Sequence, residues 1–177
     1  MGLFFPNWLT NRGKNIIQDL QRGRISIPIP ESALAAVVSQ IDEPSVSDLA
    51  LSIAANSQLI FTGRKKIGPW WIPFSATFSA RAPAAGAPPQ SIDLKLERTS
   101  PSLAYPFALK ALGKREEFEV VGSRVLVDIG KRIKDQDWAR YLPDSVLSHI
   151  RVVEISSDSD ARQLKVALAV KIPDESG

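Results

Sequence analysis

The only histidine of the chain, His149, follows Ser148 and lies close to Asp144, so the residue types of a Ser–His–Asp triad are near one another. The serine of an α/β-hydrolase sits in a G-x-S-x-G turn, and the sequence contains no such motif. His149 also stands at the start of an expected strand, with no activated nucleophile beside it. These three residues therefore do not predict a hydrolase.

Acidic residues cluster in two places whose chemistry could involve a cation or a proton. Asp158-Ser159-Asp160 resembles the start of a calcium-binding loop but lacks the later ligands and the closing glutamate of an EF-hand. Residues 116–119 contain three glutamates directly after Lys114 and Arg115, a mixture that is typical of a solvated face. We expect a hairpin turn at the first place and a charged surface at the second.

Several kinds of enzyme site are excluded by residue type alone. The chain has no cysteine and one histidine, so a single copy offers no thiolate metal site, thiol nucleophile or multi-histidine metal site. It also contains neither a G-x-G-x-x-G motif nor a phosphate-binding loop. The sequence therefore predicts a binding protein that is not an enzyme and has no metal or other cofactor.

Aromatic and basic residues meet in the middle of the chain. Trp70 and Trp71 stand in an expected loop over residues 67–71, directly after Arg64, Lys65 and Lys66. Indole rings prefer bilayer interfaces, and lysine or arginine near anionic lipid contributes on the order of 1 kcal/mol each. The group predicts a membrane contact; the alternative is that the rings cover one end of the core beneath the loop.

The N-terminus repeats this combination of residues. Leu3, Phe4, Phe5, Trp8 and Leu9 are apolar, and four cations face one acid in the first 24 residues. The segment 1–23 is therefore predicted to be amphipathic, and its alternative role is simple packing onto the body of the protein. The whole chain is nearly balanced, with 22 lysines and arginines against 19 acids, which argues against a nucleic-acid partner.

No targeting signal is evident from the sequence. No apolar run approaches the roughly 18 residues that would span a bilayer. The start lacks a basic region and a long apolar stretch, and Pro6 replaces the serine or threonine of a myristoylation site. The chain as given is expected to be cytoplasmic or peripheral to a membrane, and exported if a signal peptide has been removed.

The first half of the chain predicts strands around one clear helix. Leu34, Val37, Val38 and Ile41 lie at helical spacing and give one apolar face. Alternating apolar residues predict strands at 24–29, 46–54, 58–66, 72–81 and 91–99.

The second half is less regular. We expect a helix at 101–113, a strand or a continued helix at 117–121, and a helix at 125–134. Two final strands, 149–156 and 163–172, flank a polar turn. The sum is about six antiparallel strands and two or three helices, so residues 24–173 are expected to form a single α+β domain with hydrophobic residues, 44% of the chain, for its core.

The order of these segments resembles a known family. Leu142-Pro143, Val146-Leu147, Ile150-Arg151-Val152 and Leu164-Lys165-Val166-Ala167-Leu168 resemble the end of LmeA-like bacterial phospholipid-binding proteins, which are similar to the tubular lipid-binding (TULIP-like) group. Ile27 to Leu34 resembles the start of that family. The resemblance implies a curved antiparallel sheet wrapped around one or two long helices, a half-TULIP-like roll, with a hydrophobic cavity or groove for lipid tails and no catalytic residues.

The leading hypothesis is a non-enzymatic protein that binds phospholipid or fatty acyl chains near a membrane. The expected lipid-binding residues are Leu34, Val37, Val38, Ile41, Leu49, Leu51, Phe74 and Phe78. The expected membrane contacts are Trp70, Trp71, Arg64, Lys65 and Lys66. The alternative is a structural or assembly subunit, including a homo-oligomer, that buries the aromatic loop and the N-terminus against a protein.

Overall fold

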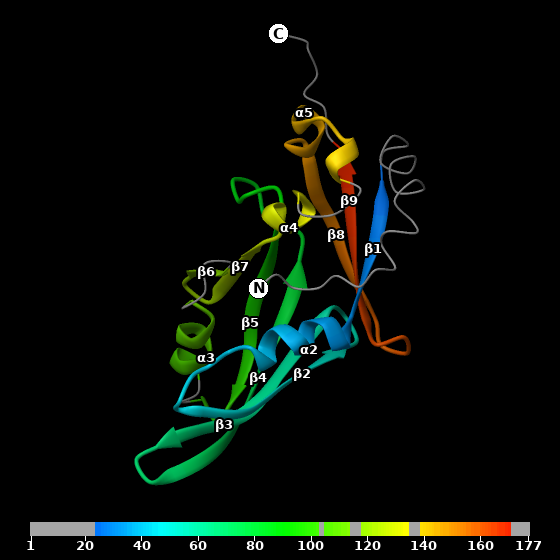
Figure 1. Cartoon of the computed structure of the whole chain (residues 1–177). Helices are drawn as coiled ribbons and strands as arrows, with labels where there is room; N and C mark the ends of the chain where they lie inside the picture. Colours follow the sequence, from blue (N-terminus) through cyan, green and yellow to red (C-terminus); the bar gives the residue numbers. More distant parts are fainter. Residues whose placement is uncertain (1–23, 103–104, 114–117, 135–138, 171–177) are drawn as a thin grey trace.

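Two antiparallel sheets form the described part of the chain. The computed structural model describes residues 24–102, 105–113, 118–134 and 139–170 (Figure 1). The larger sheet has the strand order β2 (Val46–Ala54), β3 (Gln58–Ile67), β4 (Trp70–Arg81), β5 (Ser91–Ser100), β7 (Arg124–Asp128) and β6 (Phe118–Val121). The smaller sheet has the order β1 (Ile25–Pro30), β9 (Gln163–Val170) and β8 (Ile150–Asp158).

The helices are short and lie beside the sheets. They are α2 (Glu31–Ser39), α3 (Tyr105–Leu112), α4 (Gly130–Lys134), the 3₁₀ helix η2 (Ala139–Tyr141) and α5 (Asp144–Leu147). The mainly antiparallel α+β arrangement is therefore confirmed, whereas the expectation of long helices is wrong. Helix α2 ends early because the N–H groups of Gln40 and Ile41 turn back to the carbonyls of Val37 and Val38, three residues earlier.

Strands that the alternating pattern predicts are found close to their expected bounds. β2 has the predicted bounds, because Leu51 and Ile53 point into the core while Ala50 and Ser52 point to solvent. β1, β3, β5, β8 and β9 differ from prediction by a few residues at most within the described part of the chain. The amphipathic segment 1–23 and the glutamates 116 and 117 lie outside the described residues.

The predicted loop over residues 67–71 is wrong. Trp70 and Trp71 begin strand β4, and Ile67 pairs directly with Trp70. The connection shrinks to Gly68 and Pro69, because Gly68 takes the left-handed conformation (φ +58°) that a tight reversal needs. The tryptophans are therefore held in a hairpin, in a fixed register with the basic residues of β3.

The predicted helix at 125–134 is also wrong in its first half. Residues 124–128 form β7, which pairs with β5, and only 130–134 are helical. Gly122 (φ +61°) allows the tight β6–β7 turn, so residues 118–121 take the strand alternative. The change to helix follows Asp128, whose carboxylate accepts the Gly130 N–H at 2.7 Å.

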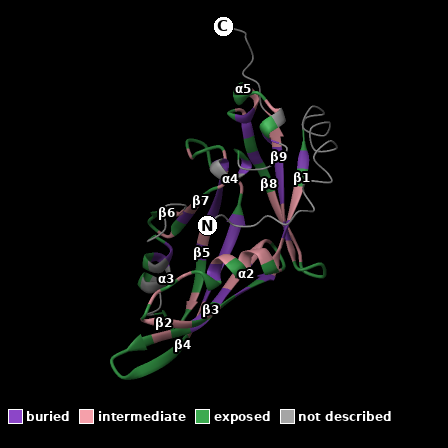
Figure 2. Ribbon diagram, in the orientation of Figure 1, coloured by how far each residue is buried: buried purple, intermediate pink, exposed green. Residues whose placement is uncertain are grey.

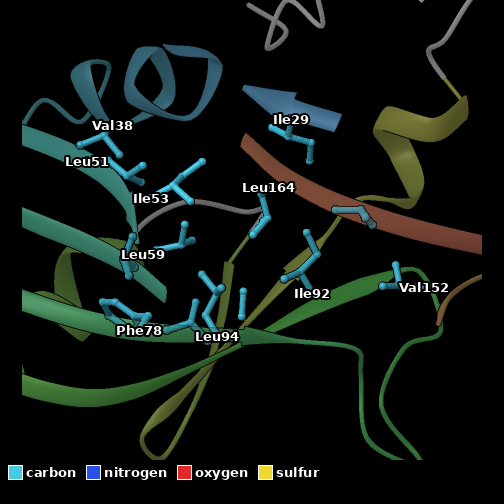
Figure 3. Close-up of a cluster of buried hydrophobic side chains, with 14 of the residues drawn as sticks. Ile29, Val38, Leu51, Ile53, Leu59, Phe78, Ile92, Leu94, Val152 and Leu164 are labelled. Atoms are coloured by element: carbon cyan, nitrogen blue, oxygen red, sulfur yellow. The ribbon is translucent and has the colours of Figure 1, made fainter. Parts of the chain in front are cut away.

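The core lies between α2, the larger sheet and the smaller sheet (Figures 2 and 3). Side chains from all three point into one cluster, in which Val38, Leu51, Phe78, Leu94 and Leu164 are buried. The rings of Phe61 and Phe78 meet edge to face, with centroids 5.3 Å apart. This packing fixes the side of the larger sheet that faces α2, which we call the inner face; the opposite side is the outer face.

The β2–β3 turn joins the two sheets. Asn56 and Ser57 both have positive φ, and the Ser57 N–H donates to the Ser157 hydroxyl at 2.8 Å. The Ser57 hydroxyl donates to the Ile155 carbonyl at 3.2 Å, so both polar groups of Ser57 contact β8. The turn therefore covers one edge of the smaller sheet.

The other strand edges near the core are covered or lack donors. The carboxylate of Glu31 accepts the Ile53 N–H at 2.8 Å, which occupies part of the outer edge of β2. On the edge strand β1, Pro28 and Pro30 pair in register with Lys165 and Gln163 but carry no N–H group. Hydrogen bonds from β1 to β9 therefore depend on Ile25, Ile27 and Ile29.

Candidate functional site

The β3–β4 hairpin extends past its neighbouring strands. β5 ends opposite Ser75 and β2 begins opposite Lys65, so the last two cross-strand pairs have no strand beside them. These pairs are Lys66–Trp71 and Ile67–Trp70. In Figure 1 this tip projects away from the body, and in Figure 2 it is coloured almost entirely as exposed.

Register determines the face to which each tip residue belongs. Directly paired residues share a face, and successive pairs alternate. Phe61 and Phe78 point into the core and therefore belong to the inner face. Counting every second position from them toward the tip, the inner face also carries the pairs Gly63–Phe74, Lys65–Ile72 and Ile67–Trp70. The outer face carries the pairs Arg64–Pro73 and Lys66–Trp71.

Large apolar side chains gather at the tip. Trp70 is 72% exposed, and Ile67, Trp71 and Ile72 are also exposed. These four residues, which we call the apex cluster, are four of the seven large hydrophobic side chains that are exposed in the described residues. A concentration of this kind on one projecting hairpin is typical of an interaction site.

The three neighbouring cations have different surroundings. Lys66 lies on the outer face with its Nζ 5.9 Å from the centroid of the Trp71 ring, within cation–π range. Arg64 is exposed on the same face. Lys65 lies on the inner face, where its ammonium donates to the Ser45 hydroxyl, which donates in turn to Glu43 at 2.8 Å. Of the three basic residues predicted to contact a membrane, Arg64 and Lys66 therefore share the outer face, and Lys65 does not.

The predicted acyl-binding residues come together between α2 and the larger sheet. Val38, Leu51 and Phe78 are buried in the core, and Leu34, Ile41 and Leu49 pack against it. Val37 and Phe74 are half-buried. At Gly63 a side chain would meet Leu49 and Phe74 at about 3.0 Å, which shows how closely these residues approach one another.

The residues of the catalytic candidates form local structural contacts. His149 Nδ1 donates to the Ser145 carbonyl, and the Ser148 hydroxyl donates to the same carbonyl at 2.9 Å. Asp158 accepts the Ala161 N–H and the Lys165 ammonium, both at 3.0 Å, as the hairpin turn predicted there requires. No group of three metal-ligating side chains occurs in the described ranges of the chain.

A polar network on the outer face was not evident from the sequence. Glu97 accepts the Ser79 hydroxyl at 2.7 Å and lies near Arg81 and Lys95. The Ser79 hydrogen bond, assisted by the charges of Lys95 and Arg81, holds the pKa of Glu97 below its usual value. The alternation of apolar and polar residues along the strands predicts only that these side chains face solvent. It does not predict that they contact one another.

Asp93 is the buried member of the same face. Its side chain is only 6% exposed, and its Oδ2 lies 3.4 Å from Arg124 Nη1. Its Oδ1 has no hydrogen-bond partner among the described residues. Arg124 is therefore the group that compensates the buried charge.

Comparison with known proteins gives no further information on the site. No family model matches the chain, and neither a curated protein nor a solved structure matches it. Among the helices that the structure describes, none is long and apolar enough to cross a membrane.

Proposed function

We propose that this protein binds lipid without transforming it, by docking the tip of the β3–β4 hairpin on an anionic membrane surface. The observation that carries the proposal is the apex cluster, with Lys66 paired to Trp71 within it and Arg64 behind it along β3. Full burial of one large apolar side chain is worth about 1.5–3 kcal/mol, and each nearby cation adds on the order of 1 kcal/mol at anionic lipid. The two contributions together are sufficient for reversible peripheral binding.

The spacing of the tip suits the depth of a bilayer interface. Cross-strand pairs succeed one another at about 3.3 Å, so Arg64 lies three pairs, about 10 Å, behind Ile67. Interfacial segments bury their apolar side to a depth of about 5–10 Å. Insertion to this depth brings Ile67, Trp70 and Trp71 to the interface, with the Lys66 ammonium beside the Trp71 ring, while Arg64 remains at the level of the phosphates.

The proposal assigns the contact with lipid tails to the tip and not to the space beneath α2. Val38, Leu51 and Phe78 already fill that space, so an acyl chain there would have to displace core packing. The resemblance of residues 24–172 to LmeA-like phospholipid-binding proteins adds support for a lipid ligand, while the hairpin supplies the location.

Flotation of the full chain with vesicles tests the proposal. We expect the chain to float with vesicles that contain phosphatidylglycerol and to bind phosphatidylcholine vesicles much more weakly. Added salt should reduce the difference, because the screening length falls from about 10 Å at 0.1 M to about 3 Å at 1 M. Failure to float with either kind of vesicle would overturn the proposal and favour a protein partner for the tip.

A further inference from the structure

The outer face next to the tip is a polar platform of small side chains. The platform reaches from the tip to Thr77, and its uncharged positions carry mainly hydroxyl or small residues: Ser47, Ala50, Ser52, Thr62, Ser75, Thr77 and Ser100. No long uncharged side chain rises above it apart from Ile60 and Trp71. Long cations on this face can therefore reach a flat surface that approaches it.

Three cations stand on this platform. Arg64 and Lys66 come from β3, and Arg98 comes from β5, where it pairs with Thr77. Among the residues that the structure describes, no carboxylate forms an ion pair with Arg64 or Arg98. The acid nearest in register is Asp48, in the bulge of β2, whose carboxylate accepts the Ser47 hydroxyl at 3.2 Å.

The cations further from the tip are different, since they have partners. Arg81 and Lys95 lie 3.3 and 3.7 Å from Glu97, and Arg124 lies 3.4 Å from Asp93. The unpaired positive charge of the outer face is therefore concentrated in its tip-proximal half.

The inner side near the tip carries two acids and one cation. Asp42 and Glu43 follow α2, which covers the inner face, and Glu43 is linked through Ser45 to Lys65. An anionic surface would therefore attract the outer face more strongly than this side. The hairpin could tilt with either its outer or its inner face toward the membrane, and the distribution of charge favours the outer face.

We infer that the protein docks in a tilted orientation, with the end of the hairpin inserted and the outer face of the larger sheet inclined toward the membrane, so that Arg98 contacts anionic lipid headgroups. This inference rests on the proposed function and specifies its geometry. Arg98 is opposite Thr77, seven residues from Trp70 along β4, or about 23 Å at 3.3 Å per residue. In an upright orientation that distance exceeds the screening length of about 10 Å, so Arg98 would not contribute.

An arginine is well suited to this second contact. Its planar guanidinium binds phosphate oxygens with two parallel hydrogen bonds, and its charge is permanent. The hydroxyls of Thr77 and Ser75, on the same face, are further donors within the platform. The tip and Arg98 then form two separated points of attachment, which fix the tilt of the protein on the membrane.

The test compares two arginines on different sheets. Arg98→Gln and Arg151→Gln remove the same charge from exposed positions, and Arg151 lies on β8 of the smaller sheet. On phosphatidylglycerol vesicles at about 0.1 M salt we expect Arg98→Gln to weaken binding about fivefold, as loss of one cation at the surface implies. Arg151→Gln should bind like the parent chain, and circular dichroism should show that both variants are folded.

Each other outcome has a defined meaning. Unchanged binding of Arg98→Gln, combined with loss of binding in Trp70→Ala, would overturn the tilted orientation and leave the proposed function standing. Equal losses in Arg98→Gln and Arg151→Gln would also overturn it, since net charge alone would then explain binding. If Trp70→Ala has no effect either, the proposed function itself fails. Stronger binding to a single-stranded oligonucleotide than to vesicles would overturn the lipid assignment.

Discussion

Lys66 and Trp71 face each other across the β3–β4 hairpin, with the Lys66 ammonium 5.9 Å from the centre of the indole ring. The pair combines a cation that favours lipid phosphates with an aromatic ring that favours the bilayer interface. Because the two residues share one cross-strand pair, the proposed docking would bring them to a membrane at the same depth. The Lys66–Trp71 contact depends on the register of β3 and β4. This register lets the hairpin present a cation and an aromatic ring side by side from two different strands.

The apex cluster is best tested with a matched pair of isoleucine and valine variants. Ile67 and Val153 are 44% and 43% exposed, on different hairpins. We expect Ile67→Ser to weaken vesicle affinity about thirtyfold, because about 2 kcal/mol of apolar burial is lost at the interface. Val153→Ser should float like the parent chain. Equal effects of the two substitutions would show that the tip has no special role.

Trp70 should affect binding without affecting folding. It is 72% exposed, so Trp70→Ala is expected to change the free energy of unfolding by less than about 0.5 kcal/mol in urea denaturation. Vesicle affinity should fall about tenfold or more, since a large aromatic side chain is lost from the interface. Adding Trp71→Ala should reduce affinity further. A double variant that still binds like the parent chain would exclude the hairpin as the lipid contact.

Arg124 is predicted to stabilise the fold through Asp93. Arg124→Met leaves the buried carboxylate without its cation and should lower the free energy of unfolding by about 1–3 kcal/mol in urea. Replacing Asp93 by leucine as well should restore most of the loss. The control is Arg162→Met, because Arg162 is 76% exposed, 4.0 Å from Glu31, and should matter by less than about 1 kcal/mol. Equal losses in the two single variants would contradict this role.

Stability should fall in acid partly through Glu97. Its pKa in the folded protein is below the ordinary value of 4.5, so the stabilisation is fully present above pH 4.5 and is lost as the pH falls through the lowered pKa. Glu97→Gln removes the titrating group. The loss of unfolding free energy between pH 6 and pH 3 should therefore be smaller in this variant than in the parent chain, and an identical pH profile would contradict the prediction.

Strands were predictable from sequence where one face is buried. Leu51 and Ile53 alternate with polar or small residues, and β2 follows with the predicted bounds. The sequence wrongly predicts a helix over the whole of 125–134, because Leu126, Ile129 and Ile133 also fit helical spacing. Pairing of Val125 and Val127 with β5 decides against the helix, and a contact between distant strands of this kind is not visible in a single segment.

The candidate site was predictable in composition but not in geometry. Trp70 and Trp71 stand next to basic residues in the sequence, so their proximity needed no structure. Their assignment to opposite faces needed the register of β3 and β4, which depends on the two-residue turn at Gly68. Arg98 was missed altogether, because only the pairing of β4 with β5 brings it to the same face as Arg64.

The prolines of β1 limit the pairing of this strand with a second copy of the protein. Hydrogen bonds to β9 use Ile25, Ile27 and Ile29, so the outward positions of the strand are Ser26, Pro28 and Pro30. Of these three only Ser26 carries an N–H group, and a strand from a second copy would find a single donor there. Growth of a continuous intermolecular sheet from β1, the first step toward a fibril, is therefore blocked by covalent structure rather than by charge.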